Sequence, residues 1–472
     1  MIHLAENTAS LPPSSIQQAR SRLLTSRLVE NRGRVTQMIG LVIESQGPVA
    51  AIGEICRIES GAPSGGVLAE VVGFRNQNLL LMPLGELHGI YLGAEVVATG
   101  HSLRVPVGDA LLGRVIDGMG HPLDDKGELE RLPLAELDLS APHPLKRERI
   151  SEVFQTGIKA IDTFVPVGRG QRLGIFAGSG VGKSTLLGMM ASKAEADVNV
   201  IALIGERGRE VREFLEKDLD EAGRRKSVVI VATSNEPALM RVKGAFLAMT
   251  IAEYFRSQGK NVLLMMDSIT RFAMAQREIG LAVGEPPSAR GYTPSVFSML
   301  PQLLERAGTS DKGAITGLFT VLVEGDDMND PIADASRSVL DGHLVLSRDL
   351  AHQNHYPAID VLGSVSRLAR DLLSPEELDM AGRARENLAV YRKNQDLITI
   401  GAYAAGSNPT VDQSIRLQKP LMDFLRQDVN TAHSRPESWQ SLGRVMTPAA
   451  PATAPVPAAA ERKRILPPRN LT

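Results

Sequence analysis

The chain has 472 residues, a formal net charge of −2 and a pI near 6.5, and 43% of its residues are hydrophobic but only 4% are aromatic. This length can bury large cores in two or three domains, whereas the balanced charge gives no general electrostatic case for a nucleic-acid partner. The single cysteine, Cys56, excludes an intramolecular disulfide and a cysteine-built metal site, and without a signal-peptide core or an apolar run of about 18 residues we expect a soluble protein in a reducing compartment.

Residues 1–33 are predicted to form an amphipathic N-terminal arm. The Pro-Pro-Ser-Ser stretch that ends at Ser15 is suited to capping a helix, and one face of that helix would be apolar and the other basic. A helix this short is marginal alone, so its order should come from a partner or from packing on the next domain. The apolar positions are Ile16, Leu23, Leu24 and Leu28, and the basic ones are Arg20, Arg22, Arg27 and Arg32.

Residues 34–100 change to short β-rich runs separated by glycine and proline turns, which predicts a small antiparallel barrel. The clearest runs are 40–44, 67–72 and 79–82. A barrel that binds single-stranded nucleic acid is expected to carry stacking aromatics. This segment contains only Phe74 and Tyr91, which disfavours a nucleic-acid translocase.

Residues 101–372 alternate apolar strands with helical patterns, which predicts a mostly parallel α/β sheet that binds its ligand at the carboxyl edge. The stretch Gly174-Ile-Phe-Ala-Gly-Ser-Gly-Val-Gly-Lys-Ser-Thr185 has the outline of a phosphate-binding loop, with Ala177 where glycine usually opens the motif. Backbone N–H groups, a lysine and a hydroxyl for Mg²⁺ would hold the phosphates of ATP. The predicted nucleotide-binding residues of the loop are Gly178, Ser179, Gly180, Val181, Gly182, Lys183, Ser184 and Thr185.

Two further acids follow apolar strands in the same region. Asp267 ends the run 261–267 and is a candidate, together with Ser184, to hold Mg²⁺. Glu206 follows the run 199–204, where a carboxylate could orient and deprotonate the attacking water. Each acid alone could also be an ordinary strand end or helix cap, but together with Lys183 they predict hydrolysis as well as binding.

Residues 373–430 are predicted to be a helical domain, beginning at the capping sequence Ser374-Pro-Glu-Glu377. The remaining residues, 431–472, include a Pro/Ala-rich stretch and a short basic cluster. Such a composition cannot bury enough apolar surface to fold alone, so we predict a disordered tail.

Several motifs resemble the catalytic-subunit family of rotary ATPases, and within it the export ATPases of the bacterial flagellum. The ATPases of virulence-type secretion needles are similar enough to stay as the alternative. The resemblance covers residues from about 34 to about 429. It is carried by Gly205-Glu-Arg-Gly-Arg-Glu210, Asp267-Ser-Ile-Thr-Arg271, Gly284-Glu-Pro-Pro-Ser-Ala-Arg-Gly-Tyr292, Leu340-Asp-Gly-His-Leu-Val-Leu-Ser-Arg348 and Tyr356-Pro-Ala-Ile-Asp360.

The resemblance implies further roles. Arg207 would lie near the γ-phosphate, Tyr356 would stack on adenine, and Arg367 would be an arginine finger that reaches the nucleotide of the neighbouring subunit. A core tyrosine and a surface arginine are the simpler alternatives for the last two. Tyr403 matches an adenine-pocket position loosely.

The resemblance also implies the setting of the protein. It would form a homo-hexamer in the cytoplasm, peripheral to the inner face of the membrane, and hydrolyse ATP with Mg²⁺ to deliver or unfold export substrates. Its partners would be a stator-like regulator bound by the N-terminal arm, a central coiled-coil stalk, the export gate and chaperone–substrate complexes. The alternative to a motor is a non-catalytic ring subunit, which should lack an acid at position 206.

Overall fold

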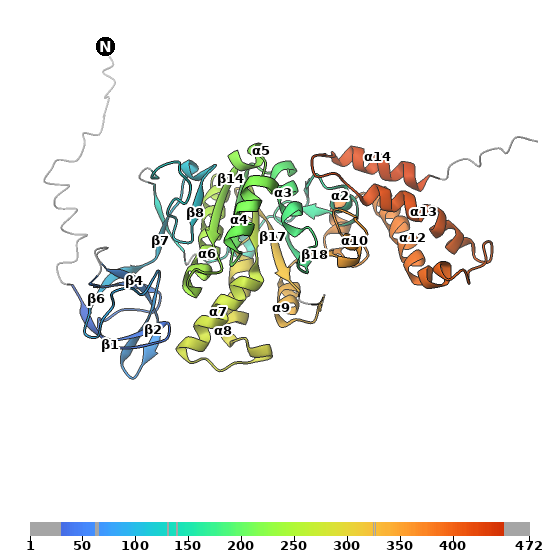
Figure 1. Ribbon diagram of the computed structural model, residues 1–472. Helices are drawn as coiled ribbons and strands as arrows, with labels where there is room; N and C mark the ends of the chain where they lie inside the picture. The colour runs from blue at the N-terminus through green and yellow to red at the C-terminus, as the bar shows by residue number, and fades with distance from the viewer. Residues whose placement is uncertain are drawn as a thin grey trace, which may run out of the picture.

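Three parts follow one another across the computed structural model: a β-barrel, an α/β core and a group of helices (Figure 1). The predicted fold class is thereby confirmed. The predicted arm helix and the low-complexity end lie outside the described residues. The structure describes residues 30–447 except 62–65, 130–131, 138–139, 324 and 326.

Six antiparallel strands close the barrel in the order β1-β2-β5-β4-β3-β6. Alternate side chains of strand β5 point to opposite faces, and both faces are buried, so this strand attaches the barrel to the next domain. Leu79 and Leu81 point into the barrel, whereas Leu80 and Met82 join the hydrophobic core of the next domain. The strands are β1 (Arg32–Ile39), β2 (Val42–Gln46), β3 (Glu54–Ile58), β4 (Val67–Arg75), β5 (Asn78–Pro83) and β6 (Glu95–Ser102).

A nine-stranded sheet forms the centre of the molecule, in the order β19-β18-β12-β17-β15-β13-β14-β8, with β16 paired to β17. Seven strands are parallel, and only β16 and β19 run antiparallel to their neighbours. The carboxyl ends of the parallel strands therefore meet at one edge. The strands are β8 (Val115–Asp117), β12 (Arg172–Ala177), β13 (Val198–Ile204), β14 (Ser227–Ala232), β15 (Asn261–Asp267), β16 (Gly308–Thr309), β17 (Ala314–Leu322), β18 (Gly342–Leu346) and β19 (Val365–Ser366).

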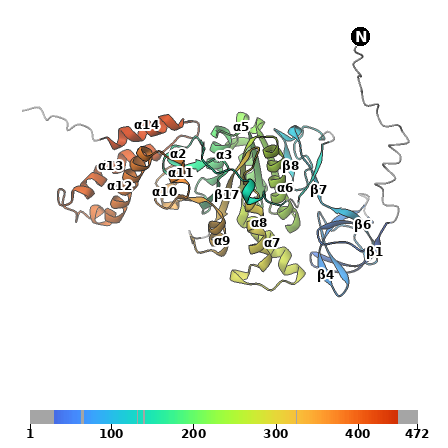
Figure 2. The ribbon, with the colours of Figure 1, turned by 180° about the vertical axis from the view of Figure 1, so that it is seen from behind.

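Helices cover both faces of this sheet (Figures 1 and 2), so its strands read as continuous apolar runs. Apolar residues of α6, α7 and α8 form one buried cluster, and those of α2 and α3 belong to a second one on the other face. The helices of the core are α2 (Lys159–Phe164), α3 (Lys183–Lys193), α4 (Gly208–Glu213), α5 (Glu221–Arg225), α6 (Ala238–Ser257), α7 (Ile269–Val283), α8 (Pro294–Glu305), α9 (Pro331–Val339), α10 (Arg348–His352) and α11 (Ala369–Leu372).

Short elements complete the core. Two small sheets pair β7 (Arg104–Pro106) with β9 (Leu134–Glu136) and β10 (Val153–Phe154) with β11 (Val167–Gly168). The short helical turns are η1 (Asp109–Leu111), η2 (Pro144–Lys146), η3 (Phe214–Asp218) and η4 (Ala289–Gly291).

Three helices form the C-terminal part: α12 (Pro375–Thr399), α13 (Pro409–Leu425) and α14 (Arg435–Met446). The predicted cap of α12 is confirmed, because the hydroxyl of Ser374 accepts from Glu377 N and the carboxylate of Glu377 accepts from Ser374 N. Buried residues of α13 and α14 belong to the same hydrophobic cluster as α3. Among the described residues, no helix is both long and apolar enough to cross a membrane.

The prediction of a disordered tail from residue 431 is wrong for α14. Its start is capped by Ser434 and Glu437, a second reciprocal capping box. The side chains of Trp439 and Leu442 are buried in the hydrophobic cluster that they share with the neighbouring helices. The guanidinium of Arg435 lies 5.9 Å from the ring centroid of Trp439. The polar composition around these two apolar residues concealed a helix that is stabilised by tertiary packing.

Candidate active site

The phosphate-binding loop joins β12 to α3 at the carboxyl edge of the sheet. Gly180 and Gly182 have positive φ angles of 79° and 86°, a conformation that glycine adopts at little cost. Gly182 is the cap residue of α3, and no side chain in the described part of the chain caps this helix. The N–H groups of its first turn are therefore available to bind an anion.

The other predicted loop residues differ in exposure. Ser179 is exposed at the tip, whereas Gly178 and Val181 are buried and fix the loop to the core. Ser184 and Thr185 lie half-buried in the first turn of α3, on the same helix end as Lys183. A hydroxyl at this position is suited to a hard cation that also binds phosphate oxygens.

Three charged side chains meet beside this loop. Lys183 Nζ lies 2.5 Å from Asp267 Oδ1 and 3.4 Å from Glu206 Oε1. Lys183 begins α3, Asp267 ends β15 and Glu206 follows β13, so the parallel strands bring them to one edge. The structure thus brings together three residues that the sequence offered as separate candidates.

Burial sets the protonation of this cluster. Loss of hydration raises the pKa of Glu206 to about 7, with the charge of Lys183 opposing this change and that of Asp267 adding to it. Burial acts to lower the pKa of Lys183, but the two carboxylates outweigh it and leave the pKa raised. Glu206 can therefore exchange a proton near neutral pH while Lys183 remains a cation.

The sequence assigned no role to two further residues at this edge. Thr320 in β17 is fully buried, and its hydroxyl lies 2.7 Å from Asp267 Oδ1, to which it donates. Arg271, in the first turn of α7, packs its side chain against Gly205, and its Nε has no hydrogen-bond partner among the described residues. Two signals in the sequence could have indicated them. Thr320 is a polar residue inside an apolar strand, and Arg271 is a cation one helical turn after Asp267.

Tyr356 lies beside the loop, in the turn after α10. A Cβ atom on Gly182 would come 3.3 Å from the Tyr356 ring, so the ring stands against the start of α3. The side chain is 41% exposed, which leaves a flat face for a base. The carbonyl of Tyr356 accepts a hydrogen bond from Gln427 N at 3.0 Å. Tyr403 instead lies in the connection between α12 and α13, and its hydroxyl hydrogen-bonds Asp412 in the first turn of α13.

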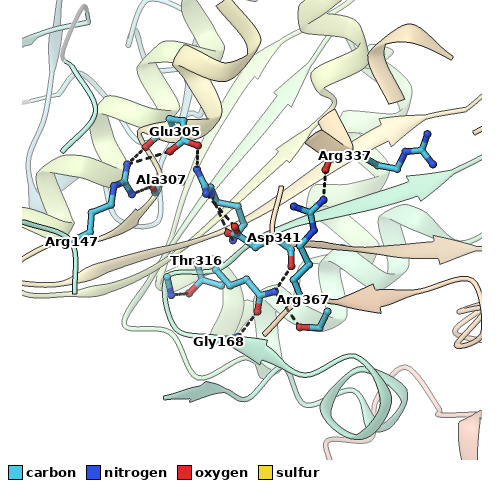
Figure 3. Close-up of polar contacts among 12 residues, drawn as sticks. Arg147, Gly168, Glu305, Ala307, Thr316, Arg337, Asp341 and Arg367 are labelled. Atoms are coloured by element: carbon cyan, nitrogen blue, oxygen red, sulfur yellow. Dashed lines mark hydrogen bonds and ion pairs between the residues drawn. The ribbon is translucent and has the colours of Figure 1, made fainter. Parts of the chain in front are cut away.

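The two remaining predicted arginines lie outside the three-residue cluster. Arg207 is the cap residue of α4, and its exposed side chain pairs with Glu210 at 3.4 Å. Arg367 follows β19, and its N–H donates to the carbonyl of Asp341, level with the first residue of β12 (Figure 3). The phosphate-binding loop begins five residues further along β12, about 17 Å away at 3.3–3.4 Å per residue. Arg367 therefore lies at the opposite end of β12 from the loop of its own chain.

These features define a P-loop ATPase with a barrel before the core and helices after it. Residues 157–366 match the model of the ATP synthase alpha/beta family, nucleotide-binding domain, and residues 35–100 match its beta-barrel domain. Residues 373–444 match the T3SS EscN ATPase C-terminal domain, which ends within α14. The chain belongs to the ATP synthase alpha/beta family.

Relatives within the family are similar over most of their length. The chain is 54% identical to the flagellum-specific ATP synthase of Bacillus subtilis, over 87% of this chain and 94% of that protein. It is 47% identical to the type 3 secretion system ATPase of Xanthomonas euvesicatoria, over 86% and 92% of the two chains. The assembled ATPase EscN of enteropathogenic E. coli superimposes with a TM-score of 0.83 at 47% identity, over 88% and 99%.

The pKa of Glu206 predicts how ATPase activity depends on pH. If ionised Glu206 is the base of the free enzyme, log kcat/KM should rise with a slope of one below about pH 7 and level off above it. The raised pKa of Lys183 keeps that residue charged through this range. Steady-state rates from pH 5.5 to 8.5, with folding verified at each pH, would measure the profile. A plateau that persists down to pH 5.5 would contradict the role of Glu206.

Proposed function

We propose that this ATPase is the motor of flagellar protein export and couples ATP hydrolysis to the delivery or unfolding of export substrates. The observation that carries the hydrolytic role is the contact of Lys183 with both Asp267 and Glu206 beside the loop. The assignment to the flagellum is supported by relatives named flagellum-specific ATP synthase at 54%, 52% and 49% identity. A needle-type secretion ATPase remains the second candidate, because relatives of that name reach 47%.

In the proposed reaction, the loop N–H groups and Lys183 hold the phosphates, while Glu206 accepts a proton from the attacking water. Ser184 and Asp267 would hold Mg²⁺, since hydroxyl and carboxylate oxygens are the donors this ion prefers. When bound, Mg²⁺ would neutralise charge on the phosphate oxygens. That neutralisation is needed because one lysine faces two acids before any phosphate arrives. Arg207 would lie near the γ-phosphate, and Tyr356 would stack on adenine.

A test in the bacterium can separate the two secretion pathways. We expect a chromosomal Lys183→Ala substitution to abolish swimming and the release of flagellar filament protein into the medium. Lys217→Ala is the matched control, because Lys217 is an exposed lysine paired only loosely with Glu213. Normal filament export together with lost release of needle-type effectors would assign the chain to the second candidate.

We further propose a homo-hexamer in the cytoplasm at the inner face of the membrane. Its expected partners are a central coiled-coil stalk, the export gate and chaperone–substrate complexes. The assembled EscN, and EscN in complex with its central stalk EscO, superimpose on this chain with TM-scores of 0.83 and 0.81 and support this arrangement. The position of Arg367, distant from the loop of its own chain, also favours an assembly in which a second copy completes the site.

The N-terminal arm is the proposed contact for a stator-like regulator. Deleting residues 1–28 should abolish capture of the regulator while leaving the nucleotide Kd unchanged, because the arm precedes the first strand of the barrel at Arg32. Co-purification with the regulator and nucleotide titration would measure the two properties. Undiminished capture by the truncated chain would reject this role.

A further inference from the structure

Gln171 is the residue that precedes β12, and its side chain is completely buried. Its Oε1 accepts from Gly168 N at 2.7 Å, and its Nε2 donates to the carbonyl of Asp341 at 3.1 Å and to Ser366 Oγ at 3.2 Å (Figure 3). Because Gly168 supplies a donor and Asp341 an acceptor, the orientation of the amide is determined. Every polar atom of this buried side chain is used.

Both acceptors of the Gln171 amide adjoin Arg367. Ser366 is its neighbour in the chain, and the carbonyl of Asp341 also accepts from Arg367 N at 3.0 Å. The Arg367 guanidinium donates to the carbonyl of Arg337 at 2.9 Å and forms no ion pair with a described residue. Arg367 is therefore fixed at its backbone, while no carboxylate of the described residues forms an ion pair with its guanidinium.

Asp341, whose carbonyl accepts from Arg367 N, is itself held by further polar contacts. The carboxylate of Asp341 accepts from Arg172 N at 3.1 Å and from the Arg172 guanidinium at 3.1 and 3.2 Å. Arg172 Nη1 also lies 2.6 Å from Glu305 Oε1, at the end of α8. The Arg172 guanidinium is mostly buried, and its two N–H contacts with one carboxylate favour a single geometry. Gln171 joins this rigid set to the end of the strand that precedes Arg367.

We propose that Gln171 is a positioning residue that holds Arg367 in place for the nucleotide bound by a second copy of this chain. The inference rests on the proposed function of Arg367. A buried amide costs free energy unless its hydrogen bonds are satisfied, and an apolar residue of similar size would fill the same space without that cost. A glutamine is needed here if the two N–H groups of its amide fix the position of β19, and therefore of Arg367, relative to Asp341.

The test compares Gln171→Met with Thr316→Val in assembled full-length protein. Met keeps the size of the side chain but removes its hydrogen bonds. Thr316 is the matched control: it is 1% exposed and accepts from Gly170 N at 2.9 Å in the same turn, but has no bond to Asp341, Ser366 or Arg367. We expect Gln171→Met to lower kcat by about 10- to 100-fold, since small misplacements of a catalytic group have effects of that order, and Thr316→Val to stay within about 2-fold of the wild type.

Two further measurements separate positioning from general structural damage. In an Arg367→Ala background, Gln171→Met should lower kcat by less than about 2-fold, because the group that it positions is gone. Mixing Gln171→Met with Glu206→Gln chains should restore activity, because a site with intact Glu206 then receives a correctly held Arg367. A defect in the loop of the same chain would not be rescued by this mixing, and the nucleotide Kd would be weakened.

The inference is overturned if Gln171→Met leaves kcat unchanged, lowers it equally in the Arg367→Ala background, or is not rescued by mixing. If Gln171→Met does not assemble, Ser366→Ala removes only one of the acceptors and should lower kcat by about 2- to 5-fold; an unchanged kcat would count equally against the inference. The proposed function fails separately, if Arg367→Ala alone leaves kcat of the assembled protein unchanged.

Discussion

Replacing Glu206 by Gln should lower kcat for ATP hydrolysis by about 10²- to 10⁴-fold, the range typical for loss of a general base. The substitution keeps the size of the side chain and removes the carboxylate that lies 3.4 Å from Lys183 Nζ. Nucleotide binding should persist, because the loop N–H groups, Lys183 and Asp267 are unchanged. Phosphate release and equilibrium nucleotide titration would measure the two effects on the same preparation.

Glu216→Gln is the matched control for this substitution. Glu216 is an exposed glutamate further along the same segment, and its carboxylate pairs with Arg212 at 2.8 Å rather than with a residue of the three-residue cluster. Its replacement should change kcat by less than about 2-fold, as expected for an exposed ion pair. Wild-type phosphate release from Glu206→Gln would remove Glu206 from the role of base, whatever the control does.

Replacing Arg367 by Ala should lower kcat of the assembled protein by about 10³- to 10⁵-fold, the range for an arginine that stabilises phosphoryl transfer in trans. The specific rate of the wild type should rise steeply with protein concentration, and this variant should lose that rise. Arg370→Ala is the matched control, because Arg370 is exposed three residues further along the same segment. Turnover measured against concentration, with the assembly state determined at each point, would test both.

Complementation gives this prediction a second readout. Arg367→Ala chains mixed with Glu206→Gln chains should regain activity, because some interfaces combine an intact Glu206 with an intact Arg367. Neither variant alone contains such an interface. A specific rate independent of concentration in a protein shown to be monomeric would mean that Arg367 acts within its own chain or not at all.

The sequence was most informative where chemistry requires a local pattern. Glycines and a lysine on one loop predicted the phosphate-binding turn, and apolar runs that end in Asp267 or lead to Glu206 predicted acids at a sheet edge. Parallel pairing places the carboxyl ends of the strands at one edge of the sheet, so the residues at these ends are expected to lie on that edge. The sequence could not supply the distances among them, because these depend on the order of the strands in the sheet.

Other features depended on contacts between distant segments. Thr320 is one polar residue in an apolar strand, and only the neighbouring position of β15 gives its hydroxyl a carboxylate partner. The separation of Arg367 from the loop follows from the antiparallel pairing of β19 with β18, which no local pattern indicates. Helix α14 was missed because its order comes from Trp439 and Leu442 packing on other helices.

The bond between Gln427 and Tyr356 gives the C-terminal helices a mechanical connection to the nucleotide site. Gln427 follows α13, and besides its backbone bond to Tyr356, its side chain donates to the carbonyl of Gly157 and accepts from Lys159 N, beside α2. A rotation of α12–α14 must therefore either break these bonds or carry the Tyr356 turn with it. In the second case, movement of the helical domain would also shift the Tyr356 ring, which stands against Gly182 at the start of α3.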